Sequence, residues 1–129
     1  MSKIFSILPR WLPALAFMAI IFAFSSTPSV ELPDFASWDY LVKKGGHFIG
    51  YGLLALSYLY GMGWKKERRW LAWLLAVLYA ASDEYHQSFV AGRHSSIWDV
   101  MIFDNFGALA ALWLHSLYLG RIISIPAKK

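Results

Sequence analysis

Residues Trp70–Arg93 read WLAWLLAVLYAASDEYHQSFVAGR, an apolar run that ends in a cluster of ionisable side chains. Placing an Asp or Arg near the centre of a membrane-spanning helix costs roughly 2.5–3.5 kcal/mol. Asp83, Glu84 and His86 lie at the end of such a run, so their placement is unfavourable in free energy unless they have partners. Ionisable groups in or beside membrane spans are by default a functional-site hypothesis. The stretch thus predicts a membrane helix with a polar site at one end.

The whole chain is strongly apolar. Of its 129 residues, 58% are hydrophobic and 16% are charged, which is too apolar for an ordinary soluble domain. Its length allows a single domain, residues 1–129. The absence of cysteine excludes disulfides, zinc–thiolate sites and thiol nucleophiles. The basic residues lie at the ends of apolar runs, so the net charge of +4 favours membrane topology and no nucleic-acid partner.

Four apolar segments predict four membrane spans, at residues 9–26, 44–64, 69–88 and 97–119. Some are shorter than the ~20 residues that cross a typical bilayer core, and local thinning of the bilayer can accommodate them. The first segment also resembles a signal peptide, but the poor cleavage site around Ser25–Ser26 favours an uncleaved helix. We therefore predict an all-α fold, a four-helix transmembrane bundle with the lipid bilayer as its surroundings.

The positive charges predict which side of the membrane each end faces. With four spans, the two termini share a side with the loop between the second and third spans. That side carries nine of the 12 Lys and Arg residues, and the other carries Lys43, Lys44 and Arg93. The positive-inside rule then places both termini in the cytoplasm and the SDEYHQ segment at the outer end.

Polar side chains form a stripe on the predicted third helix. At about 100° per residue, five of them fall within an arc of about 140°, whereas Glu84 points about 100° away from Asp83. These residues could weld the bundle through interhelical hydrogen bonds. The excess of ionisable types favours a functional site. The five residues are Tyr79, Ser82, Asp83, His86 and Gln87.

The predicted second helix carries a matching stripe. Lys44, His47 and Tyr51 are spaced i, i+3 and i+7, so they share a narrow face. Lys44 could instead snorkel to lipid headgroups, and His47 could cap the helix. A functional role is favoured because the outward topology puts this stripe at the membrane level of Asp83 and His86.

Asp104 is the most costly residue of the predicted fourth helix if it faces lipid, so it must face protein or water. It lies about 7–8 Å deeper than Asp99 at 1.5 Å per residue, and a five-residue interval fits one face of an ideal helix poorly. Either Asp99 precedes the regular helix or a π-bulge intervenes. Gly107 and Ala111, a small-xxx-small pair, allow a neighbouring helix to approach closely. The expected partners of Asp104 are His47, His86, Tyr51 and Arg93.

Two motifs carry a family resemblance. The stretch SDEYHQSFVAGRHSSIWDV, followed by Asp104 and Gly107, resembles the core signature of the VanZ-like family of small bacterial membrane proteins. The K-x-x-H-x-x-x-Y pattern that begins at Lys44 is similar to the family's upstream motif. The resemblance implies a multi-pass protein of the bacterial cytoplasmic (inner) membrane, within the cell envelope. The founding member of the family is linked to low-level resistance to the glycopeptide antibiotic teicoplanin.

The resemblance also implies a set of ten ligand-binding positions. The sequence departs from the family pattern at Gly50, where relatives often have Glu, and in the longer interval from Asp99 to Asp104. The matching positions are Lys44, His47, Tyr51, Asp83, Glu84, His86, Gln87, Arg93, Asp99 and Asp104.

The leading functional hypothesis is binding. An outward-facing polar pocket between the second, third and fourth helices would hold an anionic envelope lipid, a lipid-linked cell-wall precursor or a glycopeptide, and so contribute to antibiotic resistance. Arg93 and Lys44 would meet its phosphate or carboxylate. A structural hypothesis is that the cluster only welds the bundle and the protein serves a partner, although no protein partner is identified from the sequence.

The alternative is a membrane-embedded hydrolase or transferase acting on an envelope lipid. Its candidate acid–base residues are His47, Asp83, His86 and Asp99. A metal-dependent version would use His47 and His86 with a carboxylate such as Asp83, which is an acceptable ligand set. We expect no cofactor. Whether the protein is an enzyme is left open by the sequence.

Overall fold

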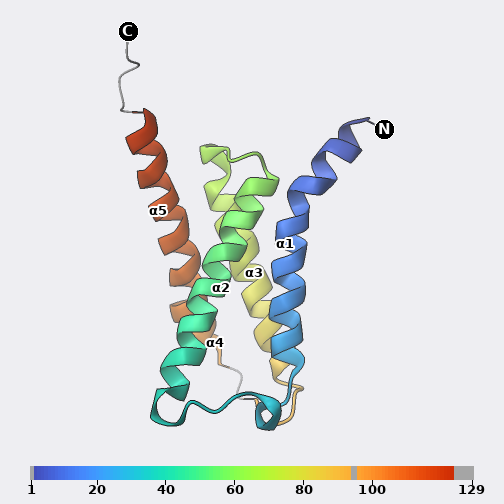
Figure 1. Cartoon of the computed structure of the whole chain (residues 1–129), viewed down its shortest axis with the longest axis vertical. Coiled ribbons are helices and arrows are strands. Elements are labelled where there is room, and N and C mark those ends of the chain that lie inside the picture. Colours follow the sequence, from blue (N-terminus) through green and yellow to red (C-terminus); the bar gives the residue numbers. More distant parts are fainter. Residues whose placement is uncertain (1, 94–95, 124–129) are drawn as a thin grey trace.

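The fold is all-helical in the part of the chain that the structure describes, residues 2–93 and 96–123 of a computed structural model. The described residues form four long helices, which run alongside one another (Figure 1). The predicted all-α class is confirmed. Lys128 and Lys129, two of the charges used to predict orientation, lie outside the described residues. The four helices are α1 (Ser2–Ser26), α2 (Asp39–Gly61), α3 (Arg69–Gln87) and α5 (Asn105–Ile123).

Short helical segments connect the long helices. Two 3₁₀ turns, η1 (Ser29–Glu31) and η2 (Ala36–Trp38), lie between α1 and α2, and η3 (Lys66–Arg68) precedes α3. The start of α1, the turn between α2 and α3 and the end of α5 lie at one end of the bundle (Figure 1). The α1–α2 segment and the connection that follows α3 lie at the other end. This arrangement agrees with the predicted pairing of loops on each side.

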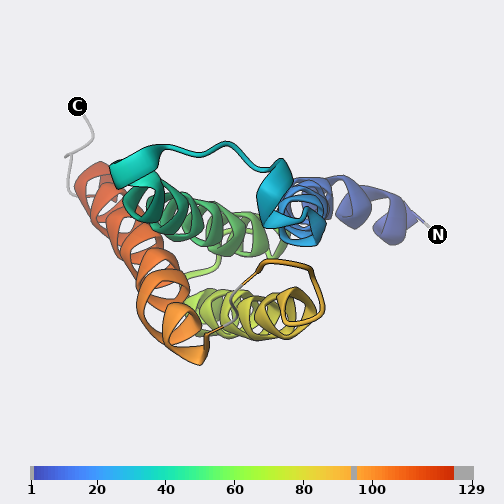
Figure 2. The same cartoon turned by 90° about the horizontal axis from the view of Figure 1, so that it is seen from below.

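α2 packs more extensively against α1 and α5 than α3 does, although α3 also reaches all three other long helices. Figure 2, a view from below, shows α2 between α1 and α5, with α3 on the opposite side of the bundle. α3 faces its neighbours with Ala72, Ala76 and Ala80, which are 1% exposed or less. Small residues at four-residue intervals let helix backbones approach closely.

Two described segments are long and apolar enough to cross a membrane, Leu8–Ser26 and Ile97–Leu119. α2 and α3 have 23 and 19 residues but are less apolar, because they carry the polar stripes. Large apolar side chains also cover the outside of the bundle: Ile49 is 62% exposed, Leu78 56% and Leu114 58%. An apolar exterior of this kind is unusual for a soluble monomer.

α2 begins and ends earlier than the predicted 44–64. Asp39, in the first turn, accepts a hydrogen bond from Lys43 Nζ at 2.8 Å, an i, i+4 pair that supports the earlier start. Gly63 and Trp64 have φ angles of 83° and 59°, which end the helix in left-handed geometry. The Trp64 amide N–H donates to the Leu59 carbonyl at 2.9 Å, closing the last turn.

α2 and α5 cross in backbone contact. A Cβ built on Gly107 would lie 2.1 Å from the carbonyl oxygen of Phe48. A Cβ on Gly52 would lie 3.0 Å from the Gly107 carbonyl oxygen and 3.2 Å from the Cβ of Ala111. The close approach predicted from Gly107 and Ala111 is confirmed. The absence of a side chain at Gly107 sets the α2–α5 distance.

We expect Gly107→Ala to destabilise the bundle by at least about 1–3 kcal/mol, because the added methyl overlaps the backbone of α2. The matched control is Gly45→Ala, where a Cβ meets nothing within 4 Å. Alanine should stabilise that helical position by up to about 1 kcal/mol. The melting temperatures of the two purified variants in detergent test this. Equal melting temperatures would contradict the close crossing.

Candidate functional site

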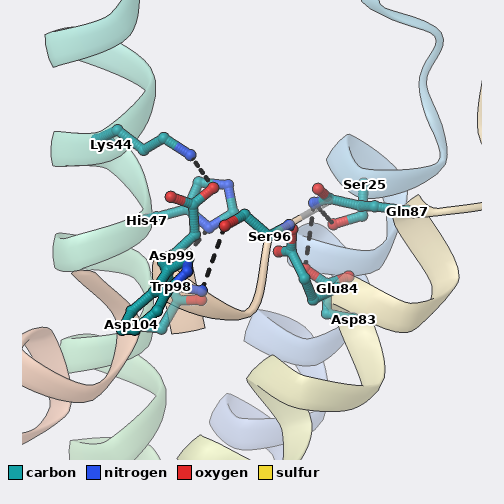
Figure 3. A network of polar contacts seen from close by, with 10 residues as sticks. All are labelled: Ser25, Lys44, His47, Asp83, Glu84, Gln87, Ser96, Trp98, Asp99 and Asp104. Carbon is teal, nitrogen blue, oxygen red and sulfur yellow. Dashed lines mark hydrogen bonds and ion pairs between the residues drawn. The ribbon is translucent and has the colours of Figure 1, made fainter. Parts of the chain in front are cut away.

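A π-helical turn positions the two aspartates that precede α5. The turn, η4 (Val100–Asp104), follows the short α4 (Ile97–Asp99) and leads into α5. Because its hydrogen bonds run from residue i to i+5, Asp99 and Asp104 share one face in spite of their five-residue interval. Of the two alternatives predicted from that interval, the π-bulge is the one observed. Figure 3 shows both carboxylates directed toward α2.

Each of these carboxylates pairs with a basic residue of α2. The Lys44 ammonium forms an ion pair with Asp99, and His47 Nδ1 lies 3.2 Å from Asp104 Oδ1 (Figure 3). Asp104 is only 2% exposed. A buried carboxylate without a partner is strongly destabilising, so the His47 contact is needed at this depth. The prediction that Asp104 faces a neighbouring helix and contacts one of the expected partners is confirmed.

The third member of the α2 stripe meets a carboxylate on α3. The Tyr51 hydroxyl donates to Asp83 Oδ2 at 3.0 Å, and both side chains are buried. Gln87 Nε2 lies 3.5 Å from the same oxygen. Asp83 Oδ1 has no hydrogen-bond partner among the described residues. The three residues of the α2 stripe therefore lie on one face of the helix, and each has a carboxylate opposite it.

The end of α3 also bonds to α1. Gln87 Nε2 donates to Ser25 Oγ at 3.0 Å, and His86 Nε2 lies 2.9 Å from Ser26 Oγ. The His86 ring stacks on Phe22, with centroids 4.6 Å apart. The two serines were not predicted as site residues. Adjacent hydroxyls at the end of an apolar helix, level with the polar cluster, were the signal available for them.

The two remaining polar residues of α3, Glu84 and Ser82, differ in burial and in their hydrogen-bond partners. Glu84 accepts a hydrogen bond from the backbone N–H of Ser96, which ties the start of α4 to α3. Its predicted direction, away from Asp83, is thereby confirmed. Ser82 is exposed and bonds only within its own helix, to the Tyr79 carbonyl at 2.7 Å. It lies at the edge of the predicted polar arc and, among the described side chains, makes no hydrogen bond to another helix.

A cavity of about 640 Å³ lies beside this network. Its lining comes from α1, the α1–α2 segment, α2 and the end of α3 with the turn after it. The sequence placed the pocket between the second, third and fourth helices. The prediction is wrong for the fourth helix, since no described residue of 97–123 lines the cavity. The first helix, α1, lines it instead. The reason is that Asp99 and Asp104 are already packed against α2. The predicted site residues in the lining are Lys44, His47, Tyr51, Gln87 and Arg93.

The basic residues at the cavity differ in how far their charge is compensated. Lys43 lies 2.8 Å from Asp39 and holds the pKa of that carboxyl below its usual value by hydrogen bonding. Lys44 is paired with Asp99. Arg93 has no carboxylate within ion-pair distance among the described side chains. The uncompensated positive charge of the cavity is therefore that of Arg93.

The sequence matches the VanZ/LLP1 family over residues 5–119. The chain belongs to the VanZ/LLP1 family. The match contains both sequence motifs and every paired residue of the polar network, so the resemblance to VanZ-like proteins is confirmed. Neither the curated proteins nor the solved structures include a match to this chain.

In this VanZ/LLP1 protein the two histidines predicted as site residues, His47 and His86, have different partners on different helices. His47 pairs with Asp104, whereas His86 faces α1. Within the described ranges, no three His, Asp or Glu side chains are grouped so that they could hold a metal ion. The weak metal candidates His47, Asp83 and His86 thus belong to three separate hydrogen-bonded groups. The histidine–carboxylate pair that the structure forms is His47 with Asp104.

We expect Asp104→Leu to lower the free energy of unfolding by about 1–3 kcal/mol, because it leaves His47 without its buried partner. Asp104→Asn keeps an oxygen that can accept from His47, so it should stay folded and lose less stability. Thermal unfolding in detergent compares the two. In an envelope-stress or antibiotic assay that depends on the wild type, the folded Asn variant should still be impaired, since it lacks the charge. Full activity of that variant would contradict a functional role for the carboxylate.

Proposed function

We propose that this VanZ/LLP1 protein is a multi-pass protein of the bacterial cytoplasmic (inner) membrane. It binds an anionic, chain-bearing component of the cell envelope in the cavity of about 640 Å³. The observation that carries the proposal is the composition of that cavity, which joins a basic end to an apolar wall. A volume of this size is within the range of small-molecule sites, roughly 300–1,000 Å³.

The apolar wall suits a hydrocarbon chain. α1 contributes four large apolar side chains, and the α1–α2 segment contributes three more residues on the same cavity. Burial of apolar ligand surface against such a wall is favourable at about 25 cal/mol per Å². A ligand with a lipid chain therefore fits better than a small polar anion. The wall residues are Phe17, Ile20, Ile21, Phe24, Leu32, Pro33 and Phe35.

The basic end suits a phosphate or carboxylate. Arg93 carries the uncompensated charge, and a guanidinium can bind either group through two parallel hydrogen bonds. His47, Tyr51 and Gln87 also line the cavity and offer further hydrogen bonds. Lys44, held by Asp99, adds positive potential near the same place.

The distribution of charge supports the proposed orientation. Lys65, Lys66, Arg68 and Arg69 cluster at the α2–α3 end of the bundle, opposite the cavity. With that end in the cytoplasm, as the positive-inside rule favours, the cavity faces outward. Ligands available there include anionic phospholipids, lipid-linked cell-wall precursors and glycopeptides. Binding of one of these would be the route by which the protein contributes to antibiotic resistance.

The test uses undecaprenyl phosphate, with uncharged undecaprenol as the matched ligand. We expect the phosphate, but not the alcohol, to raise the melting temperature of the purified protein in detergent. Arg93→Ala should weaken this binding at least tenfold, since a charge-assisted hydrogen bond contributes about 1.5–3 kcal/mol. Arg68→Ala, which removes the same charge from the exposed turn at the opposite end, is the control.

Two results would reject the binding proposal. One is equal protection by undecaprenyl phosphate and undecaprenol, which would show that only the chain is bound. The other is unchanged affinity in both Arg93→Ala and Lys44→Ala, which would remove the basic end of the cavity from the binding site.

A hydrolase or transferase acting on the same ligand is the second candidate function. It is favoured by the pair of His47 and Asp104, because His47 lines the cavity and its Nδ1 is held by a buried carboxylate. In such a pair the carboxylate orients the imidazole, and Nε2 exchanges a proton with the substrate. Asp99 and Asp83 are each engaged by a side chain of α2, so they are weaker candidates for the base.

We expect, if the protein is an enzyme, that His47→Gln lowers turnover by about 10²–10⁴-fold while leaving binding of undecaprenyl phosphate within about threefold of the wild type. Mass spectrometry of a lipid-linked cell-wall precursor incubated with the protein provides the measurement. Absence of any product with the wild type, under conditions where the ligand binds, would reject the enzymatic candidate and leave the binding proposal intact.

A further inference from the structure

A second cavity, of about 450 Å³, lies between α3 and α5 near the α2–α3 turn. We infer that this groove binds one anionic membrane phospholipid, with its phosphate on Arg69 and an acyl chain along the wall formed by α3 and α5. The residues that carry the inference are Arg69, Trp70, Trp73, Leu109, Leu112 and Trp113.

Arg69 supplies the recognition of the headgroup. Its Nε is buried and has no hydrogen-bond partner among the described residues. A buried donor without an acceptor is destabilising, so a rotation of the Arg69 side chain that brings its guanidinium onto a phosphate oxygen in the groove is favourable. The guanidinium fork also matches the geometry of two phosphate oxygens. Lys65, Lys66 and Arg68 precede Arg69, so the local charge favours an anionic headgroup over a zwitterionic one.

The wall of the groove matches the rest of a phospholipid. Trp70, the second residue of α3, is 64% exposed, and an exposed tryptophan at a helix end is typical of the headgroup level of a bilayer. Trp113, in the middle of α5, is 61% exposed and adds apolar surface to the same groove. Trp73 Nε1 donates to Asn105 Oδ1 at 2.6 Å, which fixes that ring between α3 and α5. Leu109 and Leu112 extend the apolar surface along α5. Basic, aromatic and aliphatic side chains thus line the groove together, as a headgroup, glycerol region and acyl chain require.

The groove is independent of the larger cavity. The two share no lining residue, and the start of α3 lies at the end of the bundle opposite the α1–α2 segment (Figure 1). A volume of about 450 Å³ suits a small molecule or a lipid segment and not a protein helix. The inference therefore stands whether or not the larger cavity binds an envelope component.

The test is native mass spectrometry of the purified full-length protein with phosphatidylglycerol or phosphatidylcholine of the same acyl chains. We expect the wild type to retain phosphatidylglycerol about tenfold more strongly. Arg69→Gln should reduce this retention to the phosphatidylcholine level. Arg68→Gln, which removes the same charge from an exposed neighbour outside the groove, should stay within about twofold of the wild type. Leu109→Trp, which fills the groove and keeps all charges, should also lose the lipid.

Several outcomes would overturn the inference. Equal losses in Arg69→Gln and Arg68→Gln would mean that the turn attracts lipid only by its diffuse charge. Retention in Leu109→Trp would place the acyl chain elsewhere. Loss of phosphatidylglycerol in Arg93→Ala but not in Arg69→Gln would assign the lipid to the larger cavity. Arg69→Gln should leave protection by undecaprenyl phosphate unchanged, which separates a failure here from a failure of the proposed function.

Discussion

The polar architecture of this protein depends on the need of one buried carboxylate, Asp104, for a partner. At 2% exposure inside an apolar bundle, its charge is tolerated only with a hydrogen-bonded counterpart, which is His47. For His47 to reach it, α2 must lie directly against α5. Gly107 makes this possible, because a side chain there would overlap the backbone at Phe48. The buried pair of His47 and Asp104 therefore depends on the close crossing of α2 and α5 at Gly107.

The same crossing brings the other helices into register. The π-helical turn puts Asp99 on the face of Asp104, where it meets Lys44 one turn earlier on α2. Further along α2, Tyr51 reaches Asp83 on α3, and Gln87 continues the contacts to Ser25 on α1. Apolar helices in lipid slide past each other with little change in energy, because lipid tails are as apolar as leucine. Specific polar pairs are what select one register from the many that apolar packing allows.

Much of this network could be predicted from the sequence. The predictions that were wrong have one cause. Helical periodicity fixes which residues share a face, so the stripe of Lys44, His47 and Tyr51 was predictable, as was the inward direction of Asp104. Periodicity does not say which neighbouring helix a face meets. The prediction places His86 in the same pocket as His47, yet His86 bonds to Ser26 of α1 and does not line the cavity. Gln87 lines the cavity with His47, but it donates its hydrogen bond to Ser25 of α1. The order of helices around the bundle is set by packing and by the length of the connections, neither of which a stripe of polar residues encodes.

The pairing of charges also explains where ligand chemistry remains available. Lys43, Lys44 and His47 each have a carboxylate partner, so their contribution to anion binding is reduced by the charge beside them. Gly46 and Gly50 line the same cavity, although a Cβ at either position would meet no atom within 4 Å. Packing does not require glycine there, and glycine within a helix costs about 0.5–1 kcal/mol relative to alanine. A side-chain-free surface on α2 instead leaves more room in the cavity, as the proposed binding of a phosphate with an attached chain requires.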